Sequence, residues 1–259
     1  MPTALVTGAS SGIGWELARA LAEDGHDLVL VSRNGPRLEK LARDLESAGN
    51  VRVRALARDL SDPAAPASIA KELATAGVAI EVLVNNAGFG VYGPFAETSG
   101  DQELDMIRLN VTAVTDLTKL FLPGMLERRR GRILNVASTA AFQPGPLMAV
   151  YYATKAYVLS FSEALANELQ GSGVTVTALC PGPTITNFQK RARMERTRLF
   201  SSPLSMEARS VARAGLSGMK RGRRVVIPGI GNKLLVQSVR FSPRRLVAMV
   251  ARAIQENRR

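Results

Sequence analysis

The sequence has too few cysteine and histidine residues for most metal sites. Cys180 and His26 are the only residues of their kinds among 259. A single cysteine excludes an internal disulfide, and one thiol with one imidazole cannot supply the ligands of a usual zinc site. We therefore expect neither an internal disulfide nor a metal ion.

Long apolar runs are also absent. Although 46% of the residues are hydrophobic, no stretch of 18 or more is continuously apolar, so no segment is predicted to span a bilayer. The first residues, MPTALVTG, enter an apolar run without the basic residues that open a signal peptide. We expect a cytoplasmic protein that buries its apolar residues in a sizeable core.

Acidic residues are scarce toward the C-terminus. Residues 1–189 hold 16 Lys and Arg against 19 Asp and Glu, whereas residues 190–259 hold 18 against 3. A basic region of this kind suits an anionic partner, either nucleic acid or a membrane surface. The region has only two aromatic residues to stack on bases, Phe200 and Phe241, so nucleic-acid binding is the less favoured reading.

Two patterns alternate regularly along the chain. Short apolar runs rich in β-branched residues lie at 3–7, 28–32, 51–57, 80–85, 132–137, 174–180 and 224–228. Between them, apolar residues recur at helical spacing at 14–25, 36–49, 65–77 and 156–170. Helices are predicted to end in left-handed C-caps at Gly25, Gly49, Gly77 and Gly171. The alternation predicts an α/β Rossmann fold: one domain with a doubly wound parallel sheet of about seven strands and a basic C-terminal extension.

A glycine-rich segment, VTGASSGIG at 6–14, follows the first predicted strand and opens a helix. Gly8, Gly12 and Gly14 permit a tight turn and a close approach of backbone N–H groups to a pyrophosphate. A P-loop would need a lysine after its last glycine, and Trp15 stands there instead. At the start of a strand–helix–strand unit, this pattern predicts a dinucleotide site.

The end of the second predicted strand indicates which dinucleotide is bound. Ser32 and Arg33 stand where NAD-binding folds usually place an acidic residue. A guanidinium binds the 2′-phosphate of NADP(H) through charge-assisted hydrogen bonds, whereas a carboxylate would repel it. We expect NADP(H) rather than NAD(H).

The segment YYATK at 151–155 is the candidate for chemistry. A tyrosine and a lysine four residues apart on a helix share one face, with Cβ atoms about 5–6 Å apart. Such pairs are also common on protein surfaces. The spacing alone therefore does not establish a catalytic role.

Taken together, these features resemble the short-chain dehydrogenases/reductases. The motifs of that family occur in its order and at its spacing: TGASSGIG (7–14), NNAG (85–88), Asn110, Ser138, YYATK and PGPTIT (181–186). The match runs from residue 3 to about 188 and weakens beyond. The resemblance implies an enzyme that interconverts a carbonyl and a secondary alcohol with NADP(H). Its substrate would be apolar or of acyl type, such as a 3-oxoacyl compound or a hydroxysteroid.

The resemblance also assigns catalytic roles. It makes Tyr151 the acid/base, while Tyr152, rotated by about 100° around the helix, should face elsewhere. Lys155 is implied to lower the pKa of Tyr151 and to hold the nicotinamide ribose. Ser138 is implied to hydrogen-bond the substrate oxygen, and Asn110 to hold a water that links Lys155 to solvent.

The cofactor contacts implied by the resemblance are spread over the whole motif set. Asp59 corresponds to an adenine contact, the segment 86–88 to a ribose contact and the PGPTIT segment to carboxamide contacts. The full set of expected cofactor residues is Gly8, Ser10, Ser11, Gly12, Ile13, Gly14, Ser32, Arg33, Asp59, Leu60, Asn86, Ala87, Gly88, Tyr151, Lys155, Pro181, Gly182, Thr184 and Thr186.

Within the single domain we distinguish residues 1–189, the dinucleotide-binding and catalytic core, from residues 190–259. The second part is expected to hold a substrate lid, the last strand and the basic extension. The basic segment at 189–204 is the candidate lid, and a solvated basic helix is the alternative for it. The family often pairs the helices that carry Asn110 and Tyr151, which implies a homodimer or homotetramer. A non-catalytic NADP(H)-binding regulator is the alternative function, although it would need none of the four catalytic residues.

Near the C-terminus, residues 232–241 and 242–255 each carry a short apolar stripe among basic residues. The stripe residues Leu246, Val247, Val250 and Ile254 follow helical spacing, and the basic residues around them are Lys233, Arg240, Arg244, Arg245 and Arg252. Either the stripes form interfacial helices on an anionic membrane, or they pack on the sheet or a partner subunit while the charges are solvated.

Overall fold

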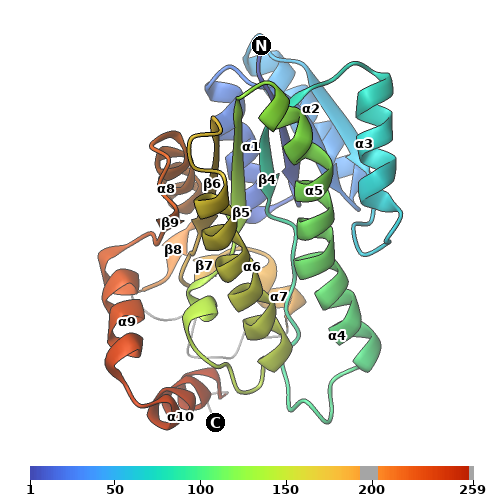
Figure 1. Cartoon of the computed structure of the whole chain (residues 1–259). Coiled ribbons are helices and arrows are strands. Elements are labelled where there is room, and N and C mark those ends of the chain that lie inside the picture. Colours follow the sequence, from blue (N-terminus) through green and yellow to red (C-terminus); the bar gives the residue numbers. More distant parts are fainter. Residues whose placement is uncertain (193–203, 257–259) are drawn as a thin grey trace.

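The computed structural model describes residues 1–192 and 204–256 and contains the predicted parallel sheet (Figure 1). Seven strands run parallel in the order β3-β2-β1-β4-β5-β6-β9. Their bounds are β1 Thr3–Thr7, β2 Asp27–Ser32, β3 Val53–Ala57, β4 Ile80–Asn85, β5 Gly131–Val136, β6 Val174–Leu179 and β9 Val225–Val226. The order reverses between β1 and β4, which is the crevice where doubly wound sheets bind their ligands.

Helices cover both faces of the sheet because successive residues of a buried strand point to opposite sides. Ala4 and Val6 of β1 pack in one core with α1 (Gly12–Glu23), α2 (Gly35–Ala48) and α8 (Ala208–Lys220). Leu5, between them in the sequence, packs in the other core with α3 (Ala65–Thr75) and α5 (Ala113–Glu127). The end of α6 (Ala149–Glu168) reaches that second core, and Figure 1 shows α5 and α6 in front of the sheet.

The remaining elements lie near the carboxyl ends of the strands. They are α4 (Gly100–Ile107), α7 (Phe188–Arg191), a small second sheet of β7 (Thr184–Ile185) and β8 (Met206–Glu207), α9 (Ile230–Phe241) and α10 (Arg244–Gln255). In Figure 1, α9 and α10 lie at the lower left, beside this end of the sheet. No helix among the described residues is both long and apolar enough to cross a membrane.

Three of the four expected glycine caps are left-handed and one is not. Gly25, Gly77 and Gly171 have φ values of 77°, 64° and 76°. Gly49 is extended, with a φ of −152°, so the prediction of a left-handed cap there was wrong. The chain leaves α2 in extended backbone toward β3, and the Gly49 N–H already donates to the Leu45 carbonyl at 3.1 Å. No left-handed residue is needed to satisfy that end of the helix.

Candidate active site

The glycine-rich turn between β1 and α1 is built around close backbone contacts. Gly8 and Gly12 have φ values of 67° and 60°, a region that favours glycine. A Cβ on Gly14 would collide with the Gly8 carbonyl oxygen, and one on Gly8 would lie 2.7 Å from the Asn86 amide nitrogen. Only glycines fit these positions, and the resulting cradle at the start of α1 suits a pyrophosphate.

Asn86 holds this turn in place. Its side-chain Nδ2 donates to the Thr7 carbonyl at 2.9 Å and to the Gly8 carbonyl at 3.3 Å. Thr7 Oγ1 in turn accepts the backbone N–H groups of Asn86 and Ala87 at 2.9 and 3.0 Å. The segment after β4 is therefore fastened directly to the glycine-rich turn.

A cavity of about 1270 Å³ runs from the glycine-rich turn to α9 and α10. It is larger than the roughly 300–1,000 Å³ of most small-molecule sites, so it has room for more than one bound molecule. Of the predicted site residues, all except Gly14 and Asn110 line it. Gly14 packs behind the turn, and Asn110 lies behind the cavity wall.

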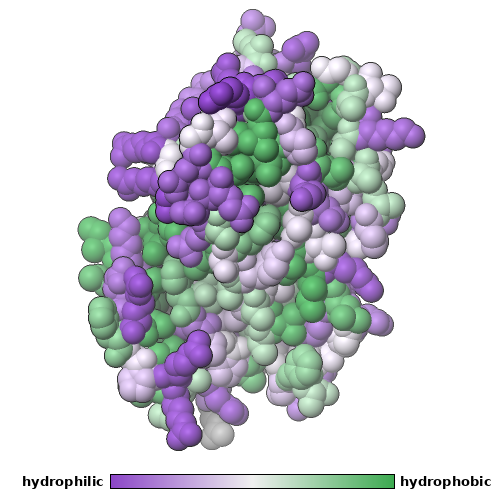
Figure 2. All heavy atoms as spheres, in the orientation of Figure 1, coloured by the Kyte–Doolittle hydropathy of each residue, from purple (hydrophilic) through white to green (hydrophobic). Residues whose placement is uncertain are grey.

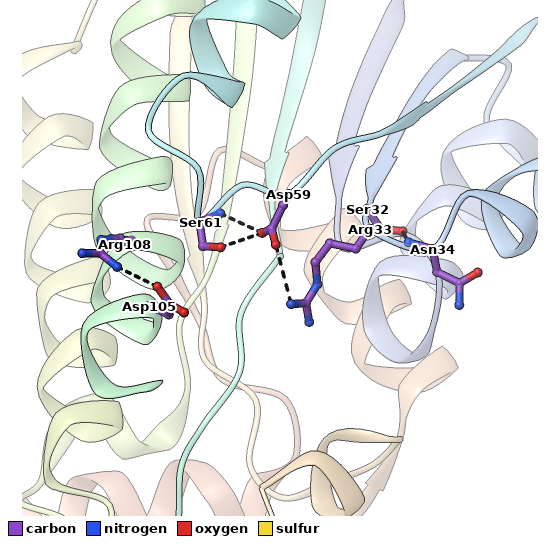
Figure 3. Close-up of polar contacts among 7 residues, drawn as sticks. All are labelled: Ser32, Arg33, Asn34, Asp59, Ser61, Asp105 and Arg108. Atoms are coloured by element: carbon purple, nitrogen blue, oxygen red, sulfur yellow. Dashed lines mark hydrogen bonds and ion pairs between the residues drawn. The ribbon is translucent and has the colours of Figure 1, made fainter. Parts of the chain in front are cut away.

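At one end of the cavity Arg33 points toward Asp59, as Figure 3 shows. The Arg33 Nη1 lies 3.7 Å from the Asp59 Oδ2, and both side chains are partly exposed. Burial raises the pKa of Asp59, but hydrogen bonds from Ser61 and the charge of Arg33 outweigh it and hold the pKa below its ordinary value. The carboxylate therefore stays ionised and keeps the guanidinium at the end of β2.

Arg58 is a cavity residue that the sequence reasoning missed. It lines the same end as Arg33, donates to the Ala57 carbonyl at 3.0 Å and pairs with Glu72 at 2.9 Å. Its place in the sequence could have indicated this position, because Arg58 directly precedes Asp59, a predicted cofactor residue, just after β3. The cavity thus has two arginine residues at this end.

Tyr151, Lys155 and Ser138 meet in the middle of the cavity. Tyr151 and Lys155 lie one turn apart on α6, with Lys155 Nζ 5.8 Å from the centre of the Tyr151 ring. Ser138 follows β5, its Oγ donates to the Pro181 carbonyl at 3.5 Å, and it lies close enough to the Tyr151 phenol to lower its pKa. Its Oγ also accepts the Ala140 N–H at 3.1 Å, which fixes the hydroxyl beside the phenol.

Burial shifts the pKa values of both groups on α6. It lowers the pKa of Lys155 to about 8, with the Cys180 thiol opposing the shift. It raises the pKa of Tyr151 above its ordinary value, against the hydrogen bond from Ser138. Burial therefore outweighs the lowering that was expected from the Lys155 ammonium together with the positive charge of an oxidised nicotinamide. Lys155 Nζ itself donates to the Val136 carbonyl at 2.8 Å.

Asn110 lies in a π-helical turn, Arg108–Thr112, between α4 and α5. It is 1% exposed, and its Oδ1 accepts the Phe89 N–H at 3.2 Å while its Nδ2 donates to the Phe89 carbonyl at 3.0 Å. Nδ2 also donates to Thr154 Oγ1 at 3.1 Å, one residue before Lys155. Asn110 thus ties the segment after β4 to the helix that carries Tyr151.

Tyr152 also lines the cavity, but its hydroxyl has other hydrogen-bond partners than that of Tyr151. Burial raises its pKa to about 12, with a hydrogen bond from Gln143 opposing the shift. Its hydroxyl accepts a 2.7 Å hydrogen bond from Gln255 Nε2 at the end of α10, and the Gln255 carbonyl accepts one from the Tyr92 hydroxyl at 2.8 Å. Tyr152 and Tyr92 therefore hold α10 against the cavity, a contact that spacing in the sequence does not reveal.

The far end of the cavity is apolar. Its walls there come from α9 and α10 and include Leu235, Val239, Leu246, Val247 and Val250. The predicted lid at 189–204 lies largely outside the described residues. Among the residues that the structure describes, no group of three or more His, Cys, Asp or Glu side chains is arranged to hold a metal.

Comparison with known proteins identifies the family. Residues 2–197 match the family model described as short chain dehydrogenase. The chain belongs to this family. Short-chain dehydrogenases bind a nicotinamide cofactor, and the glycine cradle of this chain fits the pyrophosphate of one.

Solved structures and a curated relative agree with this membership. A short-chain dehydrogenase from Sphingobium yanoikuyae in complex with NADPH is 36% identical, with a TM-score of 0.82 over 95% of this chain and 97% of that one. One from Burkholderia phymatum in complex with NAD is 27% identical, with a TM-score of 0.81 over 91% and 92%.

The curated relative is a very-long-chain 3-oxoacyl-CoA reductase of Phaeosphaeria nodorum, 36% identical over 83% of this short-chain dehydrogenase. The match covers 64% of that relative. Two further relatives of that name, from Pyrenophora tritici-repentis and Aspergillus clavatus, are covered over 65% and 62%. The chain thus spans slightly less than two thirds of the length of these relatives.

Proposed function

We propose that the protein is an NADP(H)-dependent ketoreductase that interconverts a carbonyl and a secondary alcohol. The observation that carries the proposal is the meeting of Tyr151, Ser138 and Lys155 where the glycine-lined half of the cavity joins its apolar half. When bound, NADPH would supply the hydride, and the chain's own residues would manage the proton. The test is a screen of carbonyl compounds in which the absorbance of NADPH is followed.

In this proposal Tyr151 gives its proton to the substrate oxygen. The raised pKa keeps the phenol protonated at neutral pH, the state that a proton donor needs. Ser138, which lies beside it, would stabilise negative charge on the oxygen as it develops. For alcohol oxidation the same phenol would have to accept the proton, which nearby positive charge would favour.

Lys155 and Asn110 would supply protons to Tyr151 from the side away from the substrate. Because its pKa is about 8, the Lys155 ammonium can release a proton near neutral pH more readily than an exposed lysine. A Cβ placed on Gly88 would lie 2.9 Å from Asn110 Oδ1 and 3.6 Å from Lys155 Nζ, so both groups approach the same point of the backbone. We assign Asn110 to positioning Lys155 and to holding the water of a proton relay.

We also propose a preference for NADP(H). The two guanidinium groups of Arg33 and Arg58 at the end of the cavity favour a 2′-phosphate, with Ser32 beside them. The remaining predicted cofactor residues would hold the pyrophosphate, ribose and carboxamide as the family resemblance implies. The Burkholderia neighbour binds NAD, so a competitive titration of both cofactors is the deciding measurement.

The apolar end of the cavity supports a long apolar or acyl-type substrate, such as a 3-oxoacyl thioester, as the name of the Phaeosphaeria relative suggests. A non-catalytic NADP(H)-binding regulator is the alternative. It would bind NADPH with the same cradle but reduce no carbonyl compound in the screen.

A homo-oligomer is proposed on the face that carries α4, α5 and α6. Exposed apolar residues gather on these helices: Leu104, Ile107, Leu120, Leu126 and Tyr157. Scattered apolar residues on a monomer surface are common, but several on neighbouring helices favour a subunit contact. Light scattering of the unaltered protein and of Leu104→Glu tests this. A charge buried in the subunit contact should dissociate the oligomer and so lower the measured molecular mass.

A further inference from the structure

Helix α9 carries an apolar stripe on its outer side. Ile230, Leu234 and Phe241 are 78%, 65% and 87% exposed, and at 3.6 residues per turn they point within about 40° of one another. The opposite side of the helix buries Val236 and lines the cavity with Val239. The stripe is therefore not the core face of α9 but a second apolar surface that faces solvent.

Basic residues flank this stripe. Lys233 and Arg240 lie on the same helix, about 60–100° from it at that helical pitch, and Arg244 and Arg245 begin α10. None of these four has an acidic partner within ion-pair distance among residues 1–192 and 204–256. Figure 2 shows hydrophobic and hydrophilic side chains side by side over α9 and α10 at the lower left.

We propose that α9 and the start of α10 dock the protein on an anionic lipid bilayer. An exposed apolar stripe beside cations that have no acidic partner among the described residues is the pattern of an interfacial helix, in which the apolar side chains enter the bilayer and the cations meet the headgroups. A second copy of the chain is a poor occupant, because the same cations would face each other across the contact.

The cavity opens beside this surface, which connects docking to the proposed function. Leu246, Val250 and Ile254 of α10 line the cavity and are still 47%, 49% and 39% exposed, so they form an apolar rim at its mouth. Docking would bring that rim to the bilayer, and a substrate with a long acyl chain would enter from the lipid without crossing water. This last step rests on the proposed function, whereas the docking itself does not.

Co-sedimentation with vesicles tests the docking. We expect the protein to sediment with vesicles of phosphatidylglycerol and phosphatidylcholine at low salt, and to be largely released at high salt or with phosphatidylcholine alone. The double variant Leu234→Ser, Phe241→Ser should weaken partitioning by at least about ten-fold. The double variant Arg240→Glu, Arg244→Glu should weaken it further, since each lost cation alone accounts for about five-fold.

The matched control for charge is Lys40→Glu, Arg43→Glu on α2, which changes the net charge equally at two exposed residues away from α9 and α10. It should sediment nearly as the unaltered protein does. Thermal melting and NADPH binding of every variant check that folding and the cofactor site are intact, and reduction of a water-soluble carbonyl compound reports the proposed function separately.

The inference would be overturned by no vesicle binding at low salt, by an equal loss in the α2 control, or by unchanged binding in the Leu234/Phe241 variant. A concentration-dependent dimer that these two serines dissolve would show that the stripe is a subunit contact instead. Binding to an acidic protein without binding to vesicles would likewise contradict it.

Discussion

Tyr151 and Tyr152 are adjacent, both line the cavity, and have different hydrogen-bond partners. Tyr151 faces Ser138 and lies over Lys155, whereas the Tyr152 hydroxyl is engaged by Gln255 of α10. Tyr152, a neighbouring tyrosine in the same cavity, therefore serves as an internal control for substitutions of Tyr151. In the proposed function, Tyr151 has the catalytic role and Tyr152 a supporting one, within one turn of α6.

Tyr151→Phe should lower kcat by about 10²–10⁴-fold, because it removes the proton donor. NADPH binding should stay within a few-fold of the unaltered protein, since the ring and its packing remain. Tyr152→Phe should keep most of the activity. Steady-state kinetics and NADPH titration measure both, and comparable kcat values for the two variants would contradict the assignment of Tyr151.

Arg33→Ala should weaken NADPH binding by about ten- to a hundred-fold, the value of one charge-assisted phosphate contact, and leave NADH binding nearly unchanged. Titration with both cofactors measures the change. Arg43→Ala, on the exposed side of α2 and outside the cavity, is the control. If NADH binds the unaltered protein as tightly as NADPH does, the interpretation of the end of β2 is wrong.

Lys155 makes folding depend on pH. Its pKa falls from 10.5 to about 8 on folding, so the unfolded chain binds the proton more tightly than the folded one does. Burying the charged lysine therefore lowers the free energy of unfolding. This loss is complete below pH 8 and disappears as the pH rises toward 10.5. Lys155→Met should therefore raise the free energy of unfolding at pH 7 by about 2 kcal/mol. The pKa difference corresponds to a gain of about 3 kcal/mol, and the lost hydrogen bond to Val136 costs about 1 kcal/mol.

The gain from Lys155→Met should shrink or vanish near pH 10, where the native lysine is neutral. Denaturant unfolding at both pH values measures it. Lys71→Met, at an exposed position on α3, should show no such pH-dependent gain. A gain that is the same at both pH values would show that the burial of charge is not its cause.

Among the elements, α10 is held by little buried surface. Only Val247, Ala251 and Gln255 of its residues are buried, and Gln255 provides both hydrogen bonds to Tyr152 and Tyr92. The helix is nevertheless one wall of the apolar end of the cavity. Its position, and with it the shape of the apolar end of the cavity, depends on one residue near the end of the described chain, which uses both its side chain and its backbone carbonyl.

Gln255→Leu should loosen α10, at a cost of about 1–3 kcal/mol, because it removes the buried hydrogen bond from Gln255 Nε2 to the Tyr152 hydroxyl. Hydrogen exchange of the α10 amides should speed up, and KM for apolar substrates should rise more than kcat falls. Gln237→Leu, exposed on α9, is the control. Exchange at unaltered rates throughout α10 would contradict the anchoring role.

For the whole molecule, the sheet could be predicted because its strands are buried on both faces and read as continuous apolar runs. The runs at 3–7 and 80–85 coincide with β1 and β4, while the run at 51–57 is trimmed to Val53–Ala57. The basic region supplies β9 to the same sheet, so it is partly integral to the fold. The cytoplasmic location and the division at residue 189 stay predictions.

What could not be predicted depends on contacts between distant residues. The hydrogen bond from Tyr92 to Gln255 spans 163 positions, and that from Gln255 to Tyr152 spans 103. The raised pKa of Tyr151 follows from burial by the surrounding elements, which a Tyr–Lys spacing does not contain. The π-helical turn that holds Asn110 interrupts a segment whose pattern is simply helical.

The central claim is that NADPH bound in this cavity transfers a hydride to the carbonyl carbon of a substrate, while Tyr151 supplies the proton to the carbonyl oxygen. The most direct measurement uses NADPH deuterated at the transferred position, with 3-oxoacyl thioesters and bulky ketones, and analyses the product by mass spectrometry. The account predicts one deuterium on the carbon that bears the new hydroxyl, and almost no product with Tyr151→Phe. Tight NADPH binding without labelled alcohol from any of these compounds, or equal labelling by Tyr151→Phe, would contradict it.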